Sequence, residues 1–378
     1  MTRNEKKARR IVKRPRIENI QALRGVAALM VLAAHIWGAD ADYGGAEVLP
    51  DHLRIGVAGV DLFFLISGFV MIHVAGRMAS GRGPALRFLY NRGARIYPLY
   101  WIATITMIVF YLGKAQFFGE ATETGGPIRS FLLLPQPAFP ILSVGWTLVH
   151  EVYFYLIFSL ILLTAPARRF SLLGLWGAIV ALANLAGAVD TNAWTALAFS
   201  PLTFEFLAGA GIAIALDRTS TGFGRKWGLP ALGAGAALFA AQTFMFDDHR
   251  WIAMNDHGAR AFAYTAPFAL MLYGAAAVER MRGIAAPRWL IAAGDASYSL
   301  YLFHLPLILM TGKLISVMLG DRGFIDNLAI IVICIGVCLL AAFIIHRTIE
   351  RPALKLTKRL GDRVIEAKNP VWRQERIW

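Results

Sequence analysis

Charged residues are scarce in this chain, and cysteines are almost absent. Asp, Glu, Lys and Arg make up only 16% of the 378 residues, whereas hydrophobic residues make up 57% and the mean hydropathy is +0.55. This composition excludes an ordinary soluble domain. The two cysteines, Cys334 and Cys338, lie close together in one apolar run, where they cannot build a disulfide framework. We expect them to pack between helices.

The sequence also lacks zinc-type ligand spacings, a Walker loop and a dinucleotide fingerprint, so we expect no metal cofactor. A net charge of +14 would suit a nucleic-acid binder, but the basic residues flank apolar runs. Membrane topology and contact with anionic lipid explain that placement better. We therefore expect membrane lipid, and no nucleic acid, among the partners.

Long apolar runs dominate what is present. A run of about 20 residues is long enough to cross a bilayer as a helix. The candidate spans are Ile20–Gly38, Ile55–Gly76, Ile96–Gly113, Val144–Thr164, Phe170–Gly187, Phe199–Leu216, Gly228–Phe246, Ala261–Val278, Ser297–Met318 and Leu328–Ile345. The sequence therefore predicts an all-α integral membrane protein with about ten transmembrane helices.

An even number of spans places both termini on one side of the membrane. Alternate assignment of the loops puts most of the 38 Lys and Arg residues on the side of the termini, which makes that side cytoplasmic. We predict a basic cytoplasmic N-terminal segment (1–18), a ten-helix membrane domain (19–346) and a basic cytoplasmic tail (347–378). The outer loop 114–143 contains several prolines that exclude a continuous span, so we expect a short re-entrant or interfacial element there.

The first span carries two ionisable side chains on one face. His35 follows Arg24 by eleven positions, which is about three helical turns and roughly 16 Å along the axis. Ionisable groups at membrane depth are costly, and they are functional candidates for that reason. A snorkelling arginine near one interface and a structural histidine near the other would also account for the pair.

Two carboxylates are predicted near the depth of His35. Asp61 lies in the outer half of the second span and Glu151 about a turn inside the fourth. Either could orient the His35 imidazole as a general base. The alternative for Asp61 is a structural hydrogen bond between helices, and Glu151 needs a partner such as His35 or an arginine.

Arg92 and Arg95 lie directly before the third span, on neighbouring faces of one turn. Guanidinium groups bind phosphates through paired donors, so a phosphorylated cytoplasmic cofactor could dock there. Contact with lipid headgroups is the alternative. Three further polar residues at membrane depth, His150, Glu205 and His304, also fit structural roles.

Cationic groups on the cytoplasmic side and His, Asp and Glu near the exterior suit a reaction whose charged donor binds inside and whose acceptor is met outside. The same arrangement suits a proton-coupled secondary transporter of a glycan or lipid precursor, although no internal repeat supports that alternative. A non-catalytic membrane sensor would not need polar groups graded by depth.

Six motifs in order resemble the membrane acyltransferase-3 family, whose bacterial members O-acylate exopolysaccharides, lipopolysaccharide O-antigens and related glycans. The resemblance runs from about Ile17 to Pro352. The motifs are Arg24 with His35, the GVDLFFLISG run Gly59–Gly68, Arg92 and Arg95 with Pro98, Trp146 with Glu151 and Tyr155, Ser297 and Tyr298 with His304 and Pro306, and Glu350–Pro352.

The resemblance implies a multi-pass enzyme of the bacterial inner membrane. It would move an acyl group, usually acetyl, from cytoplasmic acyl-coenzyme A to a hydroxyl of a polysaccharide or lipid-linked glycan at the periplasmic side. On this pattern we assign His35, Asp61 and Glu151 to catalysis, with His35 as general base. An acylated His35 intermediate is the mechanistic alternative. The residues assigned to the acyl donor are Arg24, Arg92, Arg95, Tyr298 and His304.

Overall fold

The computed structural model describes residues 16–44, 48–76, 78–118, 124–189, 191–245, 257–320 and 323–368, and every regular element in these ranges is helical. The all-α prediction is therefore confirmed. The long helices are α2 (Glu18–Tyr43), α3 (Gly59–Ala75), α4 (Arg82–Phe118), α6 (Trp146–Leu162), α7 (Pro166–Leu185), α9 (Leu202–Arg218), α10 (Thr221–Met245), α11 (His257–Arg282), α13 (Ser297–Leu319), α14 (Phe324–Ile345) and α15 (Arg351–Lys368). The short elements are η1 (Asp51–Ala58), α5 (Pro127–Leu132), η2 (Ser143–Gly145), α8 (Ala193–Ala198), α12 (Arg288–Asp295) and η4 (His346–Glu350).

Eight helical segments within the described residues are long and apolar enough to cross a membrane. They correspond to eight of the predicted spans, and helices α7 and α10 lie at the other two. The number ten and the cytoplasmic placement of the termini stay predictions. Most of the predicted basic N-terminal segment (1–15) and the end of the tail (369–378) lie outside the described residues.

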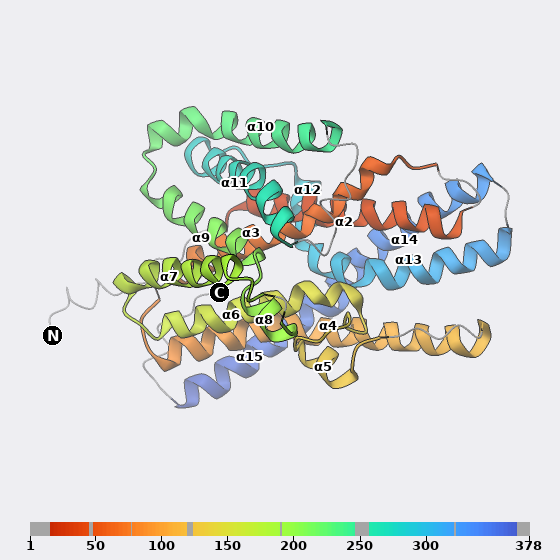
Figure 1. Cartoon of the computed structure of the whole chain (residues 1–378), viewed down its shortest axis with the longest axis horizontal. Helices are drawn as coiled ribbons and strands as arrows, with labels where there is room; N and C mark the ends of the chain where they lie inside the picture. The colour runs from red at the N-terminus through yellow and green to blue at the C-terminus, as the bar shows by residue number, and fades with distance from the viewer. Residues whose placement is uncertain are drawn as a thin grey trace.

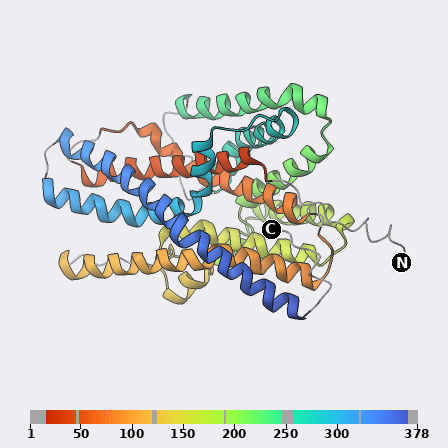
Figure 2. The same cartoon turned by 180° about the vertical axis from the view of Figure 1, so that it is seen from behind.

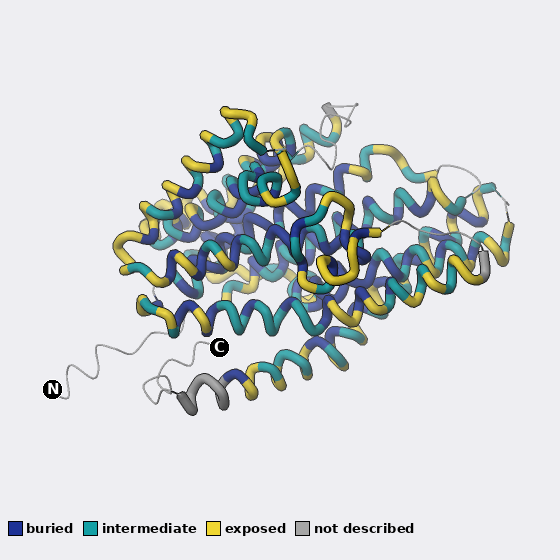
Figure 3. Tube along the Cα trace, turned by 60° about the horizontal axis from the view of Figure 1, so that its bottom comes forward, coloured by how far each residue is buried: buried dark blue, intermediate teal, exposed yellow. Residues whose placement is uncertain are grey.

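Helices α2 and α3 run through the middle of the molecule (Figure 1). Helices α10 and α11 pack together along one edge, and α4 and α6 lie at the opposite edge. Helix α15 crosses α4, as the view from behind shows (Figure 2), and the Tyr90 hydroxyl donates a hydrogen bond of 2.6 Å to the Thr357 carbonyl at this crossing. Buried residues concentrate where the central helices meet, and exposed residues face outward on the peripheral helices (Figure 3).

Small residues let the central helices approach closely. At the crossing of α3 and α9, a Cβ atom added to Gly68 would collide with the Phe206 carbonyl oxygen, and one added to Gly209 with that of Leu65. Close backbone approach at small residues is a common way for membrane helices to associate, because lipid offers no hydrophobic driving force between them. The two glycines therefore fix how α3, which carries Asp61, sits in the bundle.

Helix α4 is longer than the predicted third span because the basic stretch before it is also helical. The outer loop after α4 contains α5, which begins at Pro127, a residue suited to a first helical position. Tyr97, Tyr100 and Trp101 of α4 donate side-chain hydrogen bonds of 2.8–3.2 Å to backbone carbonyls at the end of α5. The described part of the loop is thus held against α4 by a short helix and contains no continuous span.

The expected packing role of the two cysteines is confirmed. Cys334 and Cys338 are buried and unbonded to each other, within a cluster formed by α2, α13 and α14.

Candidate functional site

Helix α2 is anchored at its first turn, which fixes the positions of Arg24 and His35. The Glu279 carboxylate of α11 accepts hydrogen bonds of 2.8 Å from the Glu18 amide and 2.6 Å from the Asn19 amide. These amides have no partner within the helix, and a negative charge at a helix N-terminus is favourable. The Asn19 side chain also donates to the carbonyls of Ala275 and Ile284 at 3.0 Å.

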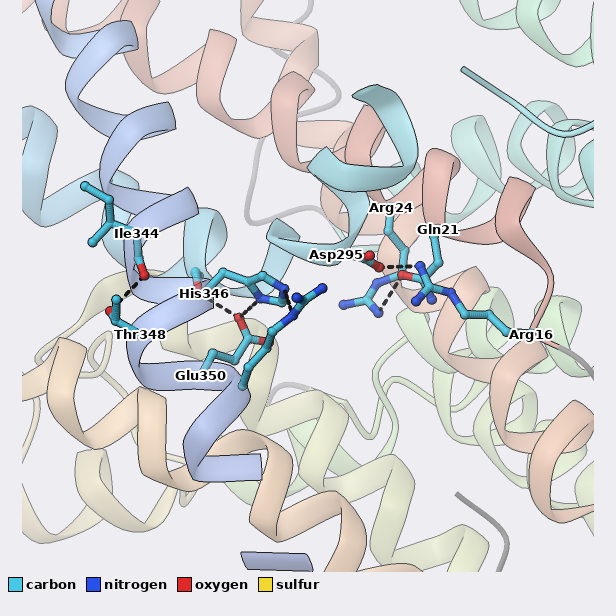
Figure 4. A network of polar contacts seen from close by, with 10 residues as sticks. Arg16, Gln21, Arg24, Asp295, Ile344, His346, Thr348 and Glu350 are labelled. Atoms are coloured by element: carbon cyan, nitrogen blue, oxygen red, sulfur yellow. Dashed lines mark hydrogen bonds and ion pairs between the residues drawn. The ribbon is translucent and has the colours of Figure 1, made fainter. Parts of the chain in front are cut away.

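A cavity of about 390 Å³, called here the inner cavity, opens beside the first turns of α2. Four arginines line it: Arg16, Arg24, Arg92 and Arg95. The structure therefore brings together the three arginines that the sequence assigned to the donor. Arg24 donates a hydrogen bond of 3.4 Å to Gln21, and Arg16 pairs with Asp295, as Figure 4 shows.

The cavity holds one described carboxylate beside these cations. Glu151 accepts hydrogen bonds from the hydroxyls of Ser67, at 3.1 Å, and Tyr155. The Tyr155 ring also lies 5.3 Å from the Arg92 guanidinium carbon, within reach of a cation–π contact. Glu151 is thus placed with the arginines of the inner cavity and not beside His35.

Tyr298 lines the inner cavity as well. Its hydroxyl donates a hydrogen bond of 2.7 Å to the Ile96 carbonyl, one residue after Arg95. This bond ties the start of α13 to the α4 turn that carries the arginine pair.

His35 lies about three turns further along α2 and lines a second cavity of about 350 Å³, called here the outer cavity. His35 is half-buried, and its Nδ1 lies 2.8 Å from the Val31 carbonyl oxygen. Because a carbonyl only accepts, Nδ1 carries the proton and donates it, which leaves Nε2 as the basic nitrogen. No described residue bonds Nε2, and a base in this form is ready to take a proton.

His304 packs against His35 and does not line the inner cavity. The two imidazole rings meet edge to face with centroids 4.7 Å apart. His304 Nδ1 donates to the Leu300 carbonyl at 3.1 Å, and its Nε2 is buried without a hydrogen-bond partner among the described residues. The structure thus places His304 beside His35 and outside the lining of the cavity that holds the arginines. Its role in donor binding stays a prediction.

The expectation that Asp61 orients His35 is not met, because Asp61 has another partner. Arg260 of α11 donates to Asp61 through Nε at 3.1 Å and through Nη2, and both side chains are fully buried. Glu205 of α9 is buried nearby, with both carboxyl oxygens lacking a hydrogen-bond partner among the described residues. The His35 tautomer is set instead by the backbone carbonyl of its own helix.

Sequence reasoning did not identify Arg260. The available signal was its position, because Arg260 is one of few basic residues on the predicted outer side. A guanidinium beside an apolar run is costly to bury unless a carboxylate pairs with it. A search for such a carboxylate in the neighbouring spans could therefore have pointed to the Arg260 pair.

Among the described residues, none lines both cavities. Phe63 and Tyr301 line the inner cavity, with ring centroids 5.8 Å apart. The Tyr301 ring lies 5.9 Å from that of His304, which in turn contacts His35. These rings, called here the ring wall, form a chain of contacts between the inner cavity and the candidate base.

The Glu350–Pro352 motif takes part in a network of polar side-chain contacts. The short π-helix η4 allows His346 Nδ1 to donate to Glu350 at 2.8 Å (Figure 4). Arg351 donates to His346 Nε2 at 3.0 Å. Glu350 also accepts a hydrogen bond of 2.6 Å from Ser299. One-turn π-helices are frequent at functional sites, and this one links α14 and α15 to α13.

Within the described ranges, no three His, Cys, Asp or Glu side chains are grouped so that they could hold a metal ion. The site combines a cationic cavity, the His35 imidazole, whose Nε2 is bonded to no described residue, and the aromatic and His304 rings that lie between them.

Comparison with known proteins identifies an acyltransferase domain over residues 17–347. The exopolysaccharide production protein ExoZ of Rhizobium meliloti is 30% identical over 285 residues, covering 72% of this chain and 82% of ExoZ. Acyltransferase MdmB of Streptomyces mycarofaciens is 26% identical over 382 residues, covering 91% and 93% of the two chains. No solved structure matches the chain.

Proposed function

The chain belongs to the membrane acyltransferase family whose domain it matches along nearly its whole length, and from that premise we propose that it transfers an acetyl group from acetyl-coenzyme A to a glycan hydroxyl. The donor binds from the cytoplasm. The acceptor, a polysaccharide or lipid-linked glycan, is met at the periplasmic side of the bacterial inner membrane. The glycan acceptor is suggested by the name of the related exopolysaccharide production protein.

The observation that carries the proposal is the convergence of Arg16, Arg24, Arg92 and Arg95 on the inner cavity. A cavity with four guanidiniums and one described carboxylate favours an anionic ligand, and guanidinium forks match phosphate oxygens. Acyl-coenzyme A carries such phosphates on its nucleotide. The excess of basic residues on the predicted cytoplasmic side supports a position of this cavity on the side where the coenzyme is available.

The distance along α2 suits the shape of the donor. With the phosphates at the arginines, the uncharged pantetheine arm extends along α2 and carries the thioester across roughly 16 Å to His35. The charged part of the donor then stays at the cationic end, which avoids the cost of burying phosphates in the apolar bundle. The ring wall formed by Phe63, Tyr301 and His304 is where the arm has to pass.

His35 supplies the base. Its Nε2 takes the proton of the acceptor hydroxyl as the oxygen attacks the thioester carbonyl carbon, forming the new C–O bond. The C–S bond then breaks, and the coenzyme A thiolate recovers the proton from the imidazolium. The proton of the acceptor hydroxyl therefore leaves on the coenzyme A thiol, and no net proton is consumed or released.

The decisive experiment combines donor binding with transfer, using purified protein in detergent and [14C]acetyl-coenzyme A. The acceptor is exopolysaccharide of the strain that carries the gene, stripped of its esters by mild alkali. We expect saturable donor binding and label on the glycan that mild alkali releases again. Folded protein that neither binds the donor nor labels the glycan would contradict the proposal.

A further inference from the structure

The outer cavity has the side chains of a carbohydrate site, and the reaction derived above does not use most of them. His35, Trp37 and Gly38 of α2 line one side, Arg54 of η1 a second and Tyr264 of α11 a third. Its volume of about 350 Å³ lies within the usual range for ligand sites, roughly 300–1,000 Å³. Apolar side chains of α13 complete the lining.

Tyr264 is the clearest sign of a ligand. The residue as a whole is 1% exposed, and its hydroxyl makes no hydrogen bond with any described residue. The hydroxyl oxygen is not fully enclosed by protein, because it belongs to a residue that lines the cavity. Tyrosine hydroxyls in such largely buried positions usually find a hydrogen-bond partner. Because Tyr264 lines the cavity, the missing partner can be supplied by a molecule bound there.

The charged groups of the cavity offset each other. Arg54 lies with its guanidinium carbon 4.8 Å from the centre of the Trp37 ring, and Asp42 lines the same cavity. The guanidinium offers donors, the carboxylate offers acceptors, and no ion pair between them occurs in the part of the chain that the structure describes. Paired donors and acceptors of this kind suit the hydroxyls of an uncharged sugar, each of which both donates and accepts.

The position of His35 adds the chemical reason for a site here. The basic Nε2 is bonded to no described residue, and His35 is half-buried against the cavity. A sugar hydroxyl held between Tyr264 and Arg54 is therefore brought next to the base that the reaction requires.

We propose that the outer cavity binds the uncharged sugar unit that receives the acyl group, with Tyr264 and Arg54 as its polar contacts. This inference rests on the proposed function, and it assigns residues to the acceptor that the motifs of the sequence did not mark.

A steric block with a matched control tests the site. A Cβ atom added to Gly38 meets nothing within 4 Å, so Gly38→Leu fills the cavity without straining the bundle. Gly336 of α14 also has open space and lies outside the cavity, which makes Gly336→Leu the control. Tyr264→Phe removes only the hydroxyl, and its acceptor KM tests the site if Gly38→Leu does not fold.

The measurement is the KM for the acceptor, with the affinity for [14C]acetyl-coenzyme A as the second readout. One arm uses soluble repeat-unit oligosaccharides from the de-esterified exopolysaccharide, and the other uses the same units linked to a lipid diphosphate. We expect Gly38→Leu to raise the acceptor KM at least about tenfold and Tyr264→Phe about three- to tenfold, with donor affinity unchanged. The acceptor that the wild type acylates, soluble or lipid-linked, identifies the source of the sugar.

The outcomes separate the two proposals. Wild-type protein that acylates neither arm contradicts the proposed function. The acceptor site alone is overturned by a different result. In that case the wild type is active, but Tyr264→Phe and folded Gly38→Leu have the same acceptor KM as the control Gly336→Leu. A glucuronate-containing oligosaccharide that competes better than its neutral counterpart overturns the assignment of an uncharged sugar.

Discussion

Arg260 of α11 and Asp61 of α3 form a buried ion pair between two residues that are 199 positions apart in the sequence. The carboxylate that sequence reasoning assigned to His35 is thus neutralised by a guanidinium from another helix. The pair is fully buried, and the Glu205 carboxyl is buried close enough to interact electrostatically with both of its members.

We expect Arg260→Ala to destabilise the protein by about 3–5 kcal/mol, because it leaves the Asp61 charge buried without a partner. Asp61→Asn/Arg260→Gln, which removes both charges, should recover much of that loss. The measurement is thermal unfolding in detergent, followed by size-exclusion fluorescence. A double variant as unstable as Arg260→Ala would show that the charge pairing is not the cause.

His35→Ala should lower the rate of transfer about 10²- to 10⁴-fold, since a positioned general base contributes about that much. Donor affinity should stay near the wild-type value, because His35 does not line the inner cavity. Steady-state kinetics and labelled acetyl-coenzyme A binding check the two parts. Retention of more than about a tenth of the activity would remove His35 as the base. Acyl-protein that accumulates without acceptor in wild type, and not in His35→Ala, would favour the covalent route.

Arg92→Ala/Arg95→Ala should weaken donor binding at least about 10- to 100-fold, because each guanidinium offers charge-assisted hydrogen bonds to phosphate. Arg288→Ala is the control, since Arg288 is exposed and outside both cavities. Equilibrium binding of the labelled donor measures the effect. An affinity equal to that of the control would exclude the pair from the phosphate site.

Gly209 and Gly211 lie two positions apart on α9, and their replacement by Ala should have different effects on the stability of the protein. The added methyl at Gly209 collides with the Leu65 backbone, whereas at Gly211 it meets nothing within 4 Å. We expect Gly209→Ala to destabilise by about 1–3 kcal/mol or more and Gly211→Ala to be neutral or stabilising by up to about 1 kcal/mol. Thermal unfolding of the two variants in one detergent provides the comparison, and equal midpoints would contradict the close helix crossing.

Cys334 and Cys338 should resist a membrane-impermeant maleimide in the native protein and react fully after unfolding in SDS, since neither thiol is exposed. Mass spectrometry counts the labels. Rapid labelling of the folded protein would contradict the packing of α14 against α2 and α13.

The sequence predicted relationships that depend on one helix and missed those that depend on how helices pack. Arg24 and His35 share a face of α2 because the helical period alone determines it. Likewise, Arg92 and Arg95 occur together because three-residue spacing places both on one side of a turn. Helical periodicity is local, so such inferences carry over to the folded chain.

The partner of Asp61 could not be predicted this way, because α3 and α11 meet only through tertiary packing. Glu151 is a similar case, since hydropathy gives its depth but not the rotation of α6 that turns it toward Ser67 and the arginines. The third span predicted from hydropathy was also shorter than α4, because an apolar window cannot detect the basic helical turns that precede the span. Nothing in the local sequence marks Tyr264, whose significance comes from the lack of a hydrogen-bond partner for its hydroxyl among the described residues.

The fixed spacing between the arginines and His35 also bears on which acyl groups the enzyme accepts. Under the proposed function, every acyl-coenzyme A has the same pantetheine arm, so the length of α2 between the arginines and His35 would bring any thioester carbonyl to the same level. Differences in acyl chain length would then be felt only beyond that level, in the outer cavity of about 350 Å³ proposed for the acceptor. A longer acyl group would compete with its own acceptor for room, and the volume beside His35 would determine donor selectivity.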